Sequence, residues 1–185
     1  MRDALAGRNL LQFGSAMTVE GISISSIWKL LRWLPGFVLR RIFTKERLGD
    51  LVVVDVRPRY EYATVNLGEV SSFQIWLQLS NLSPFAIELD RAELRFWCGG
   101  VVSKACILKK KKLTSGEVCG IYIDGSISDG QANHIARHVH NHGSAIEVDI
   151  EFNCSLHNFS KSTGHLAGVI PRFINQHTRT GIHTG

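Results

Sequence analysis

The feature that most constrains the fold is a pair of alternating segments joined by a short turn, between residues 73 and 97. Over Phe73–Ser80 every second residue is apolar, and most of the residues between them are polar. Successive side chains of a β-strand point to opposite faces, so this pattern predicts a strand with one buried face. The turn Asn81-Leu82-Ser83-Pro84-Phe85 follows, and then a second run, Ala86–Trp97. The two runs predict a β-hairpin or the corner of a sandwich.

Period-two patterning continues along most of the chain after residue 50. We expect further strands at Leu51–Val56, Arg59–Leu67, Val101–Leu108, Val118–Ile127, Ile146–Leu156 and Leu166–Phe173. The most regular is Ile146–Leu156, where a slip of one residue would bury three carboxylates, Glu147, Asp149 and Glu151. Short strands that recur with Gly, Pro or Asn turns between them are typical of an antiparallel β-sandwich.

One helix is expected within this series of strands, at Gln131–His142. Its apolar stripe consists of Ala132, Ile135, Ala136 and Val139. It also carries four histidines, at positions 134, 138, 140 and 142. His134 and His138 have the i, i+4 spacing that lets two imidazoles share a metal, but no glutamate stands beside the first one, as a metalloprotease helix requires. We therefore expect a solvated helix face and no metal site.

A basic segment with helical periodicity precedes the strands. Residues 27, 30, 31 and 34 are apolar and share one helical face, and Pro35-Gly36 separates this piece from a second one over residues 37–47. The segment combines aromatic residues with cationic ones: Trp28, Lys29, Arg32, Trp33, Phe37, Arg40 and Arg41. Three roles stay open: a helix packed on the sandwich, a helix lying on an anionic membrane, and a docking helix for a protein partner.

The charge balance points to an anionic partner or to a solubilising surface. The net charge is +5 and the sequence pI is about 9.2. Lys109, Lys110, Lys111 and Lys112 form a second basic patch, which is typical of a solvated strand edge and alternatively of a phosphate-binding site. No nucleic-acid-binding motif accompanies this patch, so nucleic acid is the weaker interpretation.

The sequence disfavours a membrane span, and its cysteines favour a reducing compartment. Residues 22–43 are the single candidate for a membrane span, but central cations and Pro35-Gly36 disfavour one. Four cysteines, at positions 98, 106, 119 and 154, form no Cys-x-x-Cys pair, and we expect buried free thiols. A disulfide between cysteines on adjacent strands is the alternative. We expect a cytoplasmic protein, peripheral at a membrane in one interpretation.

Catalytic chemistry is not indicated by any spacing of Ser, Cys, His or Asp residues. We therefore expect a protein without enzymatic activity, with no catalytic residues, no cofactor and no small-molecule substrate.

The order of strands, turns and helix resembles the late-embryogenesis-abundant type 2 family, also called the water stress and hypersensitive response (WHy) domain. In that family a strand commonly ends in an Asn-Pro-x-Pro-Phe-like turn. The turn at residues 81–85 is similar, with Leu82 in place of the first proline. Ile87-Glu88-Leu89-Asp90-Arg91 resembles the strand that follows, and Ser115-Gly116-Glu117 resembles the approach to the next one. The predicted helix falls where the family has its single helix.

The resemblance covers about residues 50–173 and implies a fibronectin-III-like sandwich of about seven strands with one helix. It also implies a non-enzymatic role linked to stress protection, membranes or lipid-associated complexes. We thus expect a basic amphipathic segment over 1–48, the sandwich over 49–173 and a flexible tail over 174–185. The expected function is a binding module tethered to an anionic membrane by its N-terminal segment. The alternatives are a soluble subunit of a larger protein assembly and a nucleic-acid-binding protein.

Overall fold

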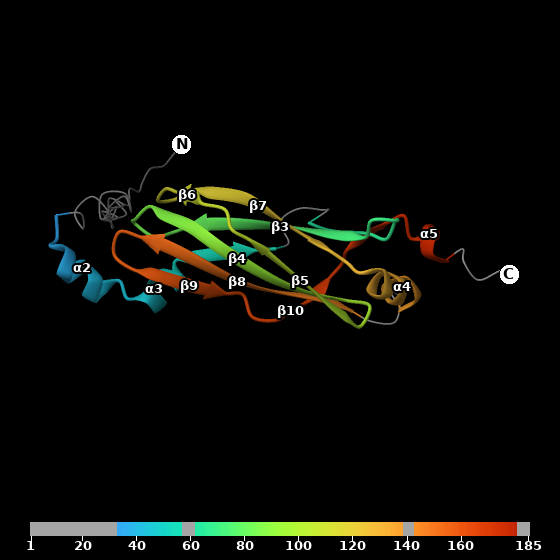
Figure 1. The fold of residues 1–185 in the computed structure, drawn as a ribbon. Coiled ribbons are helices and arrows are strands. Elements are labelled where there is room, and N and C mark those ends of the chain that lie inside the picture. The colour runs from blue at the N-terminus through green and yellow to red at the C-terminus, as the bar shows by residue number, and fades with distance from the viewer. Residues whose placement is uncertain (1–32, 57–61, 139–142, 181–185) are drawn as a thin grey trace, which may run out of the picture. The chain divides into compact units, whose positions relative to one another are not determined.

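The computed structural model describes residues 33–56, 62–138 and 143–180. The chain divides into two compact units, residues 1–34 and residues 35–185. The second unit contains all the described strands, in two sheets, together with the described helices (Figure 1). The fold is mainly β, and the predicted antiparallel β-sandwich is confirmed.

The first sheet is built on the long strand β3 (Ser72–Asn81). On one side, β1 (Val52–Asp55) and β2 (Ala63–Asn66) pair with successive halves of β3, so that together they fill a single strand position. On the other side β7 (Val118–Ser126) pairs with β3 along its length. The short β11 (Arg172–Ile174) is parallel to β2, whereas the other pairs of the sheet are antiparallel.

The second sheet has β4 (Ile87–Cys98) and β8 (Ser144–Cys154) at its centre. Outside β4 lie β5 (Val101–Ile107) and β6 (Lys111–Leu113), and outside β8 lie β9 (Asn158–Ser162) and β10 (Leu166–Val169). The eleven described strands thus fill seven main positions, three in the first sheet and four in the second, with β11 added at one edge.

The core lies between the two sheets, where the alternating apolar residues meet. The inward side chains of β3 are Phe73, Ile75, Leu77 and Leu79, and those of β8 include Ile146, Val148, Ile150 and Phe152, all buried as predicted. The rings of Phe73 and Phe96 are 5.4 Å apart and join the sheets. In β4 the buried positions change from odd to even numbers, because the register against β8 shifts between Leu89 and Arg91.

The helices of the second unit are α2 (Gly36–Ile42), α3 (Lys45–Asp50), α4 (Asp129–His138) and α5 (His177–Thr180). The predicted piece over 37–47 is two helices, because the Thr44 hydroxyl accepts a hydrogen bond from the Arg47 amide and caps the start of α3. The predicted helix within the sandwich is α4, and three of its four stripe residues are buried. The fourth, Val139, lies outside the described residues.

Two predicted elements differ from the structure in their extent. The described part of the strand predicted at Arg59–Leu67 is shorter, as β2, and residues 57–61 lie outside the description. The strand predicted at Leu166–Phe173 is divided between β10 and β11, which belong to different sheets, with Pro171 between them. Of the predicted tail, residues 174–180 contain the end of β11 and α5.

Candidate interaction surfaces

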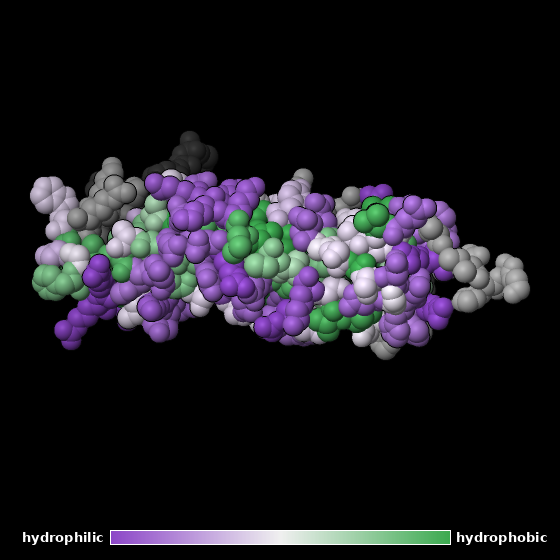
Figure 2. All heavy atoms as spheres, in the orientation of Figure 1, coloured by the Kyte–Doolittle hydropathy of each residue, from purple (hydrophilic) through white to green (hydrophobic). Residues whose placement is uncertain are grey.

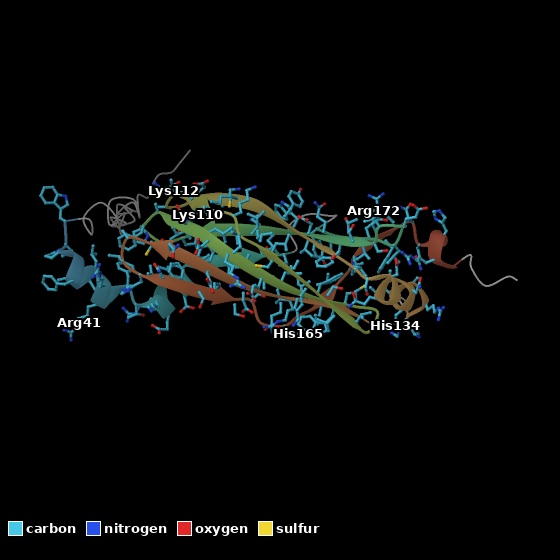
Figure 3. The ribbon with its side chains drawn as sticks, viewed as in Figure 1. Arg41, Lys110, Lys112, His134, His165 and Arg172 are labelled. Atoms are coloured by element: carbon cyan, nitrogen blue, oxygen red, sulfur yellow. The ribbon has the colours of Figure 1, made fainter. Side chains whose placement is uncertain are left out.

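Three predicted site residues share one face of α2. Phe37, Arg40 and Arg41 are spaced i, i+3, i+4 and are all exposed, with 76% of Phe37 accessible. The Arg41 side chain projects away from the sandwich (Figure 3). This arrangement presents one aromatic ring and two guanidinium groups on the same side of the helix, and we call these three residues the α2 face.

The other side of α2 is fixed to the sandwich. Leu39 and Phe43 are buried, and the ring of Phe43 meets the ring of Phe85 edge-on at 5.1 Å between centroids. The Arg47 guanidinium donates to the carbonyl of Ile42 at 2.9 Å. These contacts hold the helix at the 81–85 turn, so the α2 face is set at one end of the sandwich.

The remaining residues predicted for this surface belong to the first unit. Trp33 is 91% exposed. Trp28, Lys29 and Arg32 lie outside the described residues.

Asn81 links the 81–85 turn to β6. Its amide nitrogen lies within hydrogen-bond distance of three carbonyl oxygens, those of Phe85 (2.8 Å), Leu113 (3.2 Å) and Thr114 (3.0 Å). Its side-chain oxygen accepts from both the amide and the hydroxyl of Ser83. Because Leu113 follows the lysine run, the same turn positions both the α2 face and that run.

The four lysines of the run have different surroundings. Lys109, Lys110 and Lys112 are exposed, and the Lys110 ammonium lies 3.8 Å from the Glu88 carboxylate. Such an exposed ion pair contributes little to stability. Lys111 is half-buried and donates to the carbonyl of Gly120 on β7 at 3.0 Å. Figure 3 shows Lys110 and Lys112 at the end of the sandwich where β6 lies.

The histidines of α4 contact each other. The rings of His134 and His138 are stacked at 4.3 Å, and His138 Nδ1 lies 3.0 Å from the His134 carbonyl. In the part of the chain that the structure describes, no cluster of three or more His, Cys, Asp or Glu residues has the arrangement of a metal site. His140 and His142 lie outside that part.

The expectation that all four cysteines are buried holds for Cys98 alone. All four are free thiols, and burial raises the pKa of Cys98. Cys119 and Cys154 are half-buried, and Cys106 is exposed. Cys106 alternates with inward residues on an outer strand, so its side chain faces solvent.

Arg179 is a structural residue that the sequence interpretation missed. Its guanidinium donates to the carbonyls of Leu67 and Gly68, to the Ser71 hydroxyl and to the Asn133 side chain, and pairs with Asp129 at 2.7 Å. It thereby ties α5 to α4 and to the segment between β2 and β3. No local pattern indicates this role, because its partners lie 46 or more positions away.

Hydrophilic residues predominate on the face drawn in Figure 2, and hydrophobic residues appear there in separate groups. Among the described helices, none has the length and apolar character needed to cross a bilayer.

Comparison with known proteins assigns no family. No family model and no curated protein matches the sequence. Similar solved structures include a Northeast Structural Genomics Consortium target, with 9% identity and a TM-score of 0.47 over 66% of this chain and 89% of that one. An Arabidopsis thaliana protein has 14% identity and a TM-score of 0.45 over 61% and 80% of the two chains.

A further solution structure, provisionally named a late embryogenesis abundant protein, has 11% identity and a TM-score of 0.33 over 81% of this chain and 91% of that one. The identities and TM-scores of all three structures are low, so these similarities define no activity for this chain.

Proposed function

We propose that this protein is a non-enzymatic β-sandwich module that binds an anionic membrane surface through the α2 face and the basic segment before it. The observation that carries the proposal is the division of α2 into two faces. Leu39 and Phe43 anchor the helix to the sandwich, while Phe37, Arg40 and Arg41 are exposed together.

The chemistry of the α2 face suits a membrane interface. An aromatic ring enters the boundary between head groups and acyl chains, and cations near the surface gain about 1 kcal/mol each from anionic lipids. A seven-residue helix is too short to be stable alone in water. The buried contacts of Leu39 and Phe43 supply that stability and keep the exposed residues preorganised.

We also propose that residues 50–173 belong with the late-embryogenesis-abundant type 2 proteins. The order of β3, the 81–85 turn, β4, the later strands and the helix α4 supports this assignment, as do the hydrogen bonds of Asn81 within the turn. The absence of shared catalytic residues in that family agrees with a binding role.

Flotation with vesicles tests the membrane proposal. The full-length protein should float with phosphatidylcholine vesicles that contain about one third phosphatidylserine, and should dissociate as salt is added. The double variant Arg40→Glu/Arg41→Glu should weaken binding at least about tenfold, and Phe37→Ala should weaken it by a smaller factor.

The matched control is Arg137→Glu/Arg172→Glu, which makes the same change of charge on α4 and β11, at the end of the sandwich away from α2 (Figures 1 and 3). It should bind vesicles almost as well as the unmodified protein. Equal losses in both double variants would show a general charge effect and contradict a specific α2 face. Stoichiometric capture of a protein partner without lipid binding would favour the assembly-subunit role instead.

A further inference from the structure

The two lateral edges of the sandwich differ in how far other elements cover their outer strands. On one side, α3 packs against β9 and β1, and β11 extends the first sheet beyond β2. The packing is close, because a Cβ atom on Gly49 of α3 would lie 3.2 Å from the Ser160 carbonyl. On the other side the sheets end in β5 and β7, which contact each other, and within the described residues no strand pairs with the outer edge of either one.

The hairpin before β5 determines which backbone groups face outward. β4 and β5 are joined by Gly99-Gly100, and both glycines have positive φ, as a two-residue hairpin turn requires. In such a hairpin the flanking pair, Cys98 and Val101, is hydrogen-bonded, and bonded pairs then alternate along the strands. The amide and carbonyl groups of Val102, Lys104 and Cys106 therefore point away from β4.

A contact from α4 agrees with this assignment. The Gln131 side chain of α4 donates to the Val102 carbonyl at 3.3 Å, from outside the sheet. Among the described residues, no side chain bonds with the outward backbone groups of Lys104 and Cys106 in this way, and the side chains of both are exposed. The stretch from Lys104 to the end of β5 is thus a strand edge with outward donors and acceptors.

The edge of β7 is less accessible. The carbonyl of Gly120 already accepts a hydrogen bond from the Lys111 ammonium. In addition, the Trp76 indole lies directly over Gly120, where a Cβ atom would be 2.6 Å from the indole nitrogen. Of the two edges, that of β5 is therefore the more accessible to another strand.

The charge around β5 determines what kind of strand can pair with its outer edge. Lys104 stands beside Arg95 in the register, and Arg95 is paired with Glu147 (3.0 Å) and Asp149 (3.7 Å) on β8. Glu93, which stands beside Cys106 in the register, is paired with Arg91. These three carboxylates are therefore engaged away from the edge. Lys109 and Lys110 follow the end of β5 and are exposed, with the Lys110 ammonium 3.8 Å from the Glu88 carboxylate. Lysines therefore lie both within the strand and beyond its end.

This charge disfavours a second copy of the chain as the occupant. Antiparallel pairing of two β5 strands about their centre would place Lys104 opposite Lys104. Like charges directly opposite each other destabilise a strand pair, and an edge lysine is a common device against self-association.

We propose that β5 binds an extended acidic segment of a partner protein as an added strand. The segment would satisfy the outward backbone groups of Lys104 and Cys106, with a carboxylate opposite Lys104 and others near Lys109 and Lys110. This surface uses residues other than the α2 face, and the proposal does not depend on membrane binding.

Amide exchange measured by NMR on the full-length protein tests this proposal. The probe is a blocked peptide of about eight residues in which glutamate alternates with threonine. On binding, the amide protons of Lys104 and Cys106 should become protected from exchange with solvent, while those of Ser103 and Ala105, already bonded to β4, should change little. The same peptide with lysine in place of glutamate should not bind.

Two variants separate charge from backbone pairing. Lys104→Glu should weaken peptide binding about five- to tenfold. Cys106→Pro should also weaken it, because proline removes an outward N–H group and is tolerated at a strand edge. Lys161→Glu on β9 makes the same charge change as Lys104→Glu and should leave binding unchanged.

Several results would overturn the proposal. Unchanged exchange at Lys104 and Cys106 in the presence of bound peptide would place the peptide elsewhere. Equal binding of the lysine peptide, or full binding by Lys104→Glu, would remove the charge argument. Protection of β5 without peptide, accompanied by a dimer in sedimentation, would make a second copy the occupant.

Discussion

At the scale of single residues, Asn81 is a fully buried polar group that is held by several hydrogen bonds. It has no accessible surface. Its side chain bonds with the carbonyl of Leu113 on the distant strand β6 and with Ser83 in the turn that it begins. An asparagine supplies donors and an acceptor on one short side chain, which no apolar residue of similar size can replace. The turn that carries the family resemblance is therefore also a polar connection inside the core.

Asn81→Ala should lower the free energy of unfolding by about 3 kcal/mol, because it leaves several buried backbone groups without partners. Urea unfolding measures this loss. The matched control, Asn158→Ala, removes an exposed asparagine at the start of β9 and should change stability by less than about 0.5 kcal/mol. Similar values for the two variants would contradict the structural role of Asn81.

At the scale of elements, α2 shows how one short helix carries two aromatic residues with opposite roles. Phe43, at its C-terminal cap, packs on Phe85 in the core, whereas Phe37 in its first turn is exposed. The sequence shows two phenylalanines among basic residues, and nothing local decides which one is buried. The sandwich decides this, because the Phe85 ring packs against Phe43.

Phe43→Ala should cost about 2–4 kcal/mol of unfolding free energy, because it opens a cavity between α2 and the 81–85 turn. Phe37→Ala makes the same chemical change in the same helix and should alter stability by less than about 0.5 kcal/mol. Thermal unfolding followed by circular dichroism compares the two directly. A large loss in Phe37→Ala would mean that the exposed ring is part of the core.

At the scale of the whole sandwich, the two sheets approach each other closely between β5 and β7. A Cβ atom on Gly125 of β7 would lie 2.5 Å from the Phe73 ring and 3.0 Å from the Ala105 Cβ on β5. Glycine is therefore required there for packing. Its φ is not in the positive range, so the requirement is steric. It comes first from the Phe73 ring on the neighbouring strand β3 and then from Ala105 on the opposite sheet.

Gly125→Ala should destabilise the protein by about 1–3 kcal/mol through overpacking. Gly130→Ala, in the first turn of α4 with no atom within 4 Å of the new methyl group, should instead stabilise it by up to about 1 kcal/mol. Denaturant midpoints of the two variants should thus move in opposite directions. A neutral Gly125→Ala would show that the Phe73 ring and β5 can move aside without cost.

The strands and their inward faces could be read from the sequence because alternation is a local property. Phe73–Ser80 and Ile146–Leu156 each bury one face, and the structure buries the predicted residues up to Leu79 and Phe152. At the end of the second run Cys154 and Leu156 are only half-buried. The bulge after Leu89 and the division of 166–173 between two sheets were not predictable in this way. They arise from pairing with β8 and β2, which are distant in the sequence.

The sequence by itself determined a mainly β sandwich with a basic segment before it, through periodicity, turn residues and composition. Tertiary structure alone decided which basic and aromatic residues are available for binding. It turned Phe37 outward and Phe43 inward, bound Lys111 to β7, placed Arg179 among distant carbonyls and left the edge of β5 open. The physical reason is that exposure and pairing depend on neighbours supplied by remote parts of the chain, which no local pattern encodes.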